Sequence, residues 1–99
     1  MEGQIEIIVE YHVIPENRAA FLENLRRNCA ETLADRGCYQ MRISEPIGGD
    51  GRTIFLTEHW QDQGAIDEHR MKPGHDEQHA RTDRLVKSKK VAKCVILSD

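Results

Sequence analysis

The chain opens with an alternation of apolar and other side chains, which is typical of a β-strand. Over residues 4–13 one face is entirely apolar, whereas the other face mixes charged and apolar side chains. The apolar face consists of Ile5, Ile7, Val9, Tyr11 and Val13. Pro15 ends this strand, because proline lacks a backbone donor and suits the first turn of a helix. A helix is therefore expected to follow.

Residues 16–36 have the periodicity of an amphipathic helix, because apolar side chains recur at steps of three and four positions. The inward-facing set is Phe21, Leu22, Leu25, Cys29, Thr32 and Leu33. Asp35 belongs to the charged residues that are expected on the outer face. Gly37 is placed to end the helix in a left-handed conformation.

Two strands are expected next, over residues 38–45 and 52–60, and a glycine-rich hairpin connection joins them. On the first of these strands, one face holds Tyr39, Met41 and Ile43. On the second, one face holds Ile54, Leu56, Glu58 and Trp60. The helical region that follows is split. Residues 63–70 form a short helix with Asp62 as its N-cap, and residues 75–86 form a further helical segment.

A turn at residues 87–90 and a last strand at residues 91–97 complete the order β-α-β-β-α-β. This order predicts an α+β, ferredoxin-like fold, in which helices cover one face of a four-stranded antiparallel sheet. The first and last strands are apolar on both faces, although a sheet that is solvated on one side should alternate cleanly. The uncovered face therefore predicts a homodimer in which two copies pack through their sheets.

Composition narrows the classes of function. Ninety-nine residues correspond to one domain, residues 1–99. The net charge is −3, and the one dense basic stretch, residues 84–93, is interpreted as a solvated turn, so no nucleic acid is expected as a partner. No apolar stretch approaches the ~20 residues of a membrane span, which predicts a cytoplasmic protein without a membrane partner. Three cysteines without CxxC spacing predict neither a disulfide framework nor a zinc site.

Several short motifs, taken in order, resemble the antibiotic biosynthesis monooxygenase (ABM) family of dimeric α+β barrels. Gly37-Cys38-Tyr39 resembles the family's start of the second strand, and Glu58-His59-Trp60 resembles its E-x-W motif. Residues 65–69 match A-x-x-x-H, and residues 72–75 resemble the segment that follows it. The resemblance covers residues 5–97. It implies one ABM-like domain, a homodimer whose two sheets close into a barrel, and a pocket between the sheet and the helices of each subunit.

The resemblance also implies a reaction. Characterised family members include oxygenases of phenolic or quinol substrates that need neither metal nor flavin. We therefore expect a cofactor-independent monooxygenase that oxidises a small aromatic quinol or phenol with O2, with no cofactor and no metal site. A dry apolar pocket, a base for the phenolic proton and donors for the resulting anion would suffice. The alternative is a non-catalytic dimer of the same fold that binds a small ligand or serves a stress response.

Two histidines are the candidate catalytic bases: His69, which points inward from the short helix, and His12 on the first strand. The substrate-binding candidates are Trp60, Tyr11, Tyr39, Glu58, His75 and His79. Each candidate also has a structural interpretation. Glu58 lies among apolar neighbours and must be paired or protonated, so a histidine or Arg42 is its expected partner. His75 and His79 have metal-ligand spacing, but no carboxylate is placed with them.

Haem degradation is a third hypothesis. Trp60 and His79 stand where the resemblance places a tryptophan and an iron-ligating histidine in the haem-degrading branch of the family. That branch also carries an asparagine on the first strand, where this chain has residues Glu10-Tyr11-His12-Val13.

Overall fold

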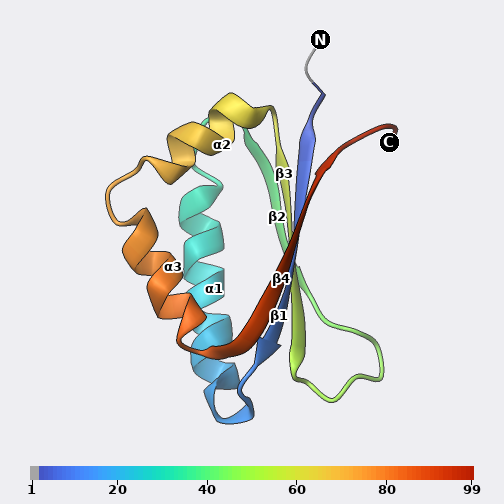
Figure 1. Ribbon diagram of the computed structural model, residues 1–99, viewed down its shortest axis with the longest axis vertical. Helices are drawn as coiled ribbons and strands as arrows, with labels where there is room; N and C mark the ends of the chain where they lie inside the picture. The colour runs from blue at the N-terminus through green and yellow to red at the C-terminus, as the bar shows by residue number, and fades with distance from the viewer. Residues whose placement is uncertain (1–2) are drawn as a thin grey trace.

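The computed structural model describes residues 3–99 as one four-stranded sheet with all helices on a single face (Figure 1). The strands are β1 (Ile5–Val13), β2 (Cys38–Ser44), β3 (Thr53–Trp60) and β4 (Val86–Val95). The helices are η1 (Pro15–Asn17), α1 (Arg18–Thr32), α2 (Gln63–Arg70) and α3 (His75–Asp83). The strand order is β2-β3-β1-β4, and every neighbouring pair is antiparallel. This topology confirms the predicted ferredoxin-like α+β fold.

The core lies between the sheet and the helices, on the side that the alternation predicts. Ile7 is opposite Glu58 and Val9 is opposite Leu56, so β1 and β3 present cross-strand rows to the helices. The buried apolar residues are Ile7, Val9, Tyr11, Val13, Phe21, Leu25, Cys29, Ile54, Leu56, Trp60, Ala65 and Ile66. Trp60 is fully buried, so the chain's only tryptophan is a core residue.

Helix α1 is shorter than the sequence predicts. It follows a 3-10 turn and ends at Thr32, not at residue 36. Gly37 has the expected left-handed φ of +81°, but it lies in the connection to β2 and not at the end of the helix. A Cβ at Gly37 would come within 2.5 Å of the Ala65 Cβ. Glycine therefore suits this position for two reasons, its backbone conformation and the close approach of α2.

A bulge in β2 overturns the predicted alternation of that strand. The pairing register with β3 shifts between Cys38 and Gln40. Cys38 therefore packs against the core together with Met41 and Ile43. Tyr39, which the alternation places on that same face, remains 50% exposed. A bulge adds one residue to a strand without any change in hydrophobic composition, so the sequence pattern does not reveal it.

The last strand begins earlier than predicted. Helix α3 ends at Asp83, and β4 runs through the lysine-rich residues 87–90, where the sequence predicts a turn. The strand ends at Val95 rather than at Leu97. β4 pairs only with β1, and lysine side chains are typical of such edge strands because they oppose pairing with another sheet. No helix within residues 3–99 is long and apolar enough to span a membrane.

Candidate functional site

A cavity of about 160 Å³ lies between the sheet and the helices. Its floor is apolar and includes Ile7, Val9 and Leu56, whereas all three α-helices contribute to its walls. Six of the eight residues that the sequence predicts for the site line this cavity. They are Tyr11, Glu58, Trp60, His69, His75 and His79. An apolar cavity of ~150 Å³ can hold a benzene molecule, so this one has room for a single aromatic ring.

Four aromatic rings form one continuous wall of the cavity. The ring centroids of Trp60 and His69 lie 5.2 Å apart. The His75 ring follows at 4.9 Å from His69, and the His79 ring lies 4.2 Å from His75. Gly74, with a φ of +90°, turns the chain from α2 into α3 and so brings the histidines of both helices together. The wall extends from the buried tryptophan to an exposed histidine.

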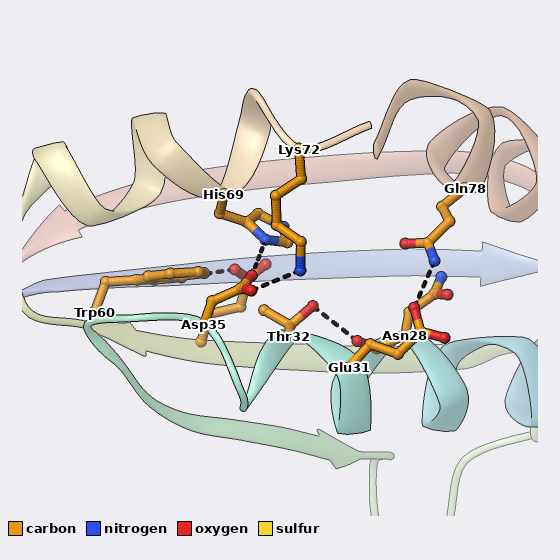
Figure 2. A network of polar contacts seen from close by, with 9 residues as sticks. Asn28, Glu31, Thr32, Asp35, Trp60, His69, Lys72 and Gln78 are labelled. Atoms are coloured by element: carbon orange, nitrogen blue, oxygen red, sulfur yellow. Dashed lines mark hydrogen bonds and ion pairs between the residues drawn. The ribbon is translucent and has the colours of Figure 1, made fainter. Parts of the chain in front are cut away.

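His69 is held in place by Asp35, which follows the end of α1 (Figure 2). Nδ1 of His69 lies 2.5 Å from Oδ2 of Asp35, and Nζ of Lys72 lies 2.6 Å from Oδ1. The side chains of His69 and Asp35 are only 17% and 13% exposed. An exposed ion pair between Arg36 and Glu68, at 3.0 Å, joins the same two segments. These contacts fix the position and the orientation of the imidazole ring.

This geometry decides which nitrogen of His69 is available as a base. Burial on its own raises the pKa of Asp35, but hydrogen bonds from Lys72 and His69 outweigh it and hold the pKa below the ordinary value. An ionised carboxylate only accepts hydrogen bonds, so Nδ1 of His69 carries a hydrogen. In the neutral ring, Nε2 then has the free lone pair.

Replacing Asp35 by asparagine should lower the free energy of unfolding by about 2 kcal/mol at neutral pH, because charge-assisted hydrogen bonds are lost. A carboxyl group with a lowered folded-state pKa stabilises the fold above its unfolded pKa of ~3.9, and this stabilisation is lost as the pH falls through the folded-state pKa. The difference between wild type and Asp35→Asn should therefore shrink in acid. Urea unfolding over a pH series measures it, with the exposed Asp67→Asn as control. A difference that persists in strong acid would show that Asp35 is not ionised in the folded protein.

Glu58 is the carboxyl group on the sheet side of the cavity. Nε1 of Trp60 donates a hydrogen bond to its Oε1 at 2.8 Å. The predicted partner, a histidine or Arg42, is therefore wrong, because the indole takes that place. Burial raises the pKa of Glu58 although the hydrogen bond from Trp60 lowers it. Burial and the nearby Glu58 also raise the pKa of Tyr11, so this phenol stays neutral and is suited to donate a hydrogen bond.

The remaining two histidines lie on α3. The His75 side chain is largely buried, and its Nδ1 lies 3.2 Å from the exposed carboxylate of Asp76. Burial, followed by the charges of His75 and Lys89, lowers the pKa of His79. Across residues 3–99, no group of three or more histidine, cysteine, aspartate or glutamate side chains is arranged to hold a metal ion. Both imidazoles line the cavity.

Two predicted site residues lie away from the cavity. His12 is on the uncovered face of β1, where its Nε2 lies 2.6 Å from Oε2 of Glu10. Tyr39 packs edge-on against His59, with ring centroids 5.2 Å apart, and its hydroxyl donates to Gln61 at 3.4 Å. Neither side chain lines the cavity, so the structure separates His12 from His69 as a candidate base.

Sequence reasoning missed Asp35 and Lys72, which position His69. The helical periodicity places Asp35 on the outer face of a helix that continues to residue 36. Because α1 ends at Thr32, the following turn directs Asp35 toward α2. The segment around Lys72 indicates only a helix break. The one signal in the sequence concerns Lys72, which follows the inward-facing His69 by three positions.

The chain has relatives both in sequence and in structure. The sequence model of the family described as antibiotic biosynthesis monooxygenase matches residues 4–81. No curated protein matches the chain. Among solved structures, the chain is similar to Rv0793 from Mycobacterium tuberculosis, with 25% identity, a TM-score of 0.86 and 97% of each chain covered.

Two further structures share the fold. PA3566 from Pseudomonas aeruginosa is 20% identical, with a TM-score of 0.85, over 99% of this chain and 98% of that one. SnoaB, a cofactor-independent oxygenase from Streptomyces nogalater, is 12% identical, with a TM-score of 0.88, over 98% of this chain and 96% of that one. Such low identities show the fold alone.

Proposed function

The chain belongs to the antibiotic biosynthesis monooxygenase family, and from this premise we propose that it oxidises a small aromatic quinol or phenol with O2 without a cofactor. The observation that carries this proposal is the position of His69. Its ring is bonded to Asp35, lines a largely shielded cavity and lies beside Trp60. A base oriented by a carboxylate next to an aromatic surface suits the removal of a phenolic proton.

The proposed reaction begins with transfer of the phenolic proton to Nε2 of His69. The imidazolium that forms is stabilised by the Asp35 carboxylate. The phenolate passes one electron to O2, and the two radicals combine at a ring carbon. The peroxide that forms takes the proton back from His69 and becomes a hydroperoxide. Loss of water leaves one oxygen atom on the ring. A hydroquinone and O2 thus give a hydroxyquinone and water, and the substrate supplies all the electrons.

The other cavity residues support this step. The Tyr11 hydroxyl remains protonated and can donate to the oxygen on which negative charge develops. Trp60 offers a flat wall for the substrate ring. An apolar floor excludes water, and this strengthens electrostatic interactions within the site.

The size of the cavity bears on the haem alternative. About 160 Å³ is well below the ~300 Å³ at which pockets for drug-sized ligands begin. A haem group is larger than this cavity, so the lining side chains would have to move to admit it. The observed geometry therefore favours a one-ring substrate. Hemin titration tests this point, because a Soret shift that requires His79 would favour haem binding.

Oxygen uptake tests the proposed reaction directly. Metal-stripped protein should consume O2 faster than the uncatalysed blank with at least one single-ring hydroquinone. Uptake that never exceeds the blank would instead favour the non-catalytic ligand-binding protein. That alternative also predicts that the ligand still binds after the cavity histidines are replaced.

A homodimer through the uncovered face of the sheet is the second part of the proposal. This face is less apolar than the sequence predicts, because Ile8 and Phe55 lie among the charged side chains of Glu6, Glu10 and Lys90. Phe55 is opposite Glu10 and Ile8 is opposite Thr57, so the two apolar side chains lie on adjacent rows of the sheet. No helix within residues 3–99 covers them.

Sedimentation should therefore find a dimer for the wild-type protein and a monomer for Phe55→Glu, because a second carboxylate opposite Glu10 would be buried between the sheets beside a like charge. Leu33→Glu is the matched control. Leu33 is also apolar and exposed, but it follows α1 on the helical side. A monomeric wild-type protein would refute the dimer, as would a variant at Phe55 that sediments unchanged.

A further inference from the structure

The wall of the cavity carries a cation that the proposed oxidation does not use. Arg70 is the last residue of α2 and lines the cavity together with Lys89 of β4. Near the start of the same helix, Gln63 contacts Lys93 of β4. This contact brings the start of α2 near β4, and Arg70 and Lys89 border the cavity from these two different elements.

The charge of Arg70 is not neutralised by the protein. Among residues 3–99, Arg70 forms no ion pair with a carboxylate. Lys89, by contrast, lies 2.8 Å from Asp83. The remaining carboxyl group of the cavity, Glu58, interacts with Arg70 only at longer range, and burial favours its neutral form. The cavity thus presents one unpaired guanidinium.

We infer that the substrate is a single-ring aromatic acid, whose ring lies in the cavity beside Trp60 and whose carboxylate binds Arg70. The phenolic part of this substrate rests on the proposed function. A planar guanidinium matches a carboxylate with two parallel hydrogen bonds. A cavity of about 160 Å³ accepts one ring and little more, so the acidic group must lie at its border.

The placement of the two polar ends follows from solvation. A carboxylate inside the apolar part of the cavity would lose its hydration without compensation. Next to Arg70, which is exposed, the same group keeps contact with water and gains an opposite charge. His69 lines the same cavity, so a phenolic group on the bound ring shares this space with the proposed base. A basic residue in the last turn also stabilises the helix itself, but that role does not require it to line a cavity.

Binding of benzoate and benzamide tests the inference without turnover, because the two have the same ring and differ in charge. Trp60 is the chain's only tryptophan and lines the cavity, so its fluorescence reports occupancy. We expect benzoate to bind about tenfold more tightly than benzamide, a difference that one charged hydrogen-bonded contact can supply. Arg70→Gln should abolish this preference. Arg26→Gln, an exposed arginine on α1, should retain it. Equal affinities in the wild type, or a preference that survives Arg70→Gln, would overturn the inference.

Oxygen uptake with gentisate and gentisamide separates this inference from the proposed function. Faster oxidation of gentisate, with the advantage lost in Arg70→Gln, supports both. Equal oxidation of the two compounds keeps the oxygenase and overturns the acid-binding role of Arg70. A benzoate preference without oxidation of either quinol supports the binding site and counts against the oxygenase.

Discussion

Replacing His69 by alanine is expected to lower the rate of O2 consumption with a single-ring hydroquinone by about 10²- to 10⁴-fold. The reason is that the phenol must lose its proton before it can reduce O2, and His69 is the histidine whose ring a buried carboxylate holds at 2.5 Å within the cavity wall. Because an uncatalysed phenol ionises more readily at high pH, the deficit should become smaller as the pH rises. The measurement is oxygen uptake over a pH series, at equal protein concentrations.

His12→Ala is the matched control, because the sequence predicts both His12 and His69 as candidate bases. Its side chain lies on the opposite face of the sheet, paired with Glu10, so the substitution should change the rate by less than about twofold. Sedimentation of the variant shows whether its oligomeric state is unchanged. If His12→Ala lost the activity and His69→Ala kept it, the catalytic cavity would have to be sought on the uncovered face.

A third variant separates the base from the residue that positions it. In Asp35→Asn the amide can donate to Nδ1 of His69, and this favours the ring form that carries its hydrogen on Nε2. The lone pair would then point away from the substrate. A loss of rate whose pH dependence also changes would identify Asp35 as a positioning residue, whereas a purely structural role would leave the pH profile of the remaining activity unchanged.

The sequence predicted the elements well where hydrophobic periodicity and stop signals agreed. Helix α2 begins after Asp62, whose side chain accepts from the Ala65 amide at 2.9 Å, and ends where the sequence predicts. Strand β3 differs from its predicted range by one residue. Both elements combine a regular pattern with a local signal, a capping side chain or the end of an alternation.

The predicted strand boundaries were wrong where local composition and strand pairing favoured different structures. The lysines of residues 87–90 favour a turn on composition, but the neighbouring β1 offers pairing partners to residues 88–90, and an edge strand tolerates the lysine charges. The bulge at Tyr39 is a similar case, because it depends on how β2 pairs with β3. Pairing is a long-range property, and a single sequence contains no direct record of it.

In the candidate site, too, the sequence predicted the residues on regular elements and missed those that depend on long-range contacts. Trp60, Glu58 and His69 were predictable because they lie on regular elements, where alternation or helical spacing fixes the side that a residue faces. His12 is also a histidine, but its side chain lies on the uncovered face of β1, on the other side of the sheet from His69. Asp35 lies in a turn, where no periodicity applies, so its bond to His69 became visible only in the structure, where the turn after α1 meets the end of α2 (Figure 2).

Trp60→Ala is expected to lower the free energy of unfolding by about 3–5 kcal/mol, the largest stability effect of the substitutions considered. The side chain is fully buried, and its removal leaves a cavity that cannot collapse, because the β1–β3 pairing and α2 hold the surrounding walls. It also removes the indole donor to Glu58, so a buried carboxyl oxygen loses its partner. Since the tryptophan signal disappears, urea unfolding must be followed by circular dichroism.

Trp60→Phe separates packing from the hydrogen bond. It keeps an aromatic ring in the core but removes the Nε1 donor and part of the ring volume, so we expect it to cost about 1–3 kcal/mol. In the background of Glu58→Gln the same substitution should cost less, because no carboxylate is left without its donor.

Met71→Ala, a substitution of an exposed side chain just beyond α2, is the control for Trp60→Ala and should change the free energy of unfolding by less than about 0.5 kcal/mol. If Trp60→Ala were as mild as Met71→Ala, Trp60 would be a wall for a ligand and not a support of the fold. A decrease in the free energy of unfolding near the expected size would mean that Trp60 both lines the cavity and stabilises the fold around it. The effect of this residue on oxidation must then be measured in Trp60→Phe.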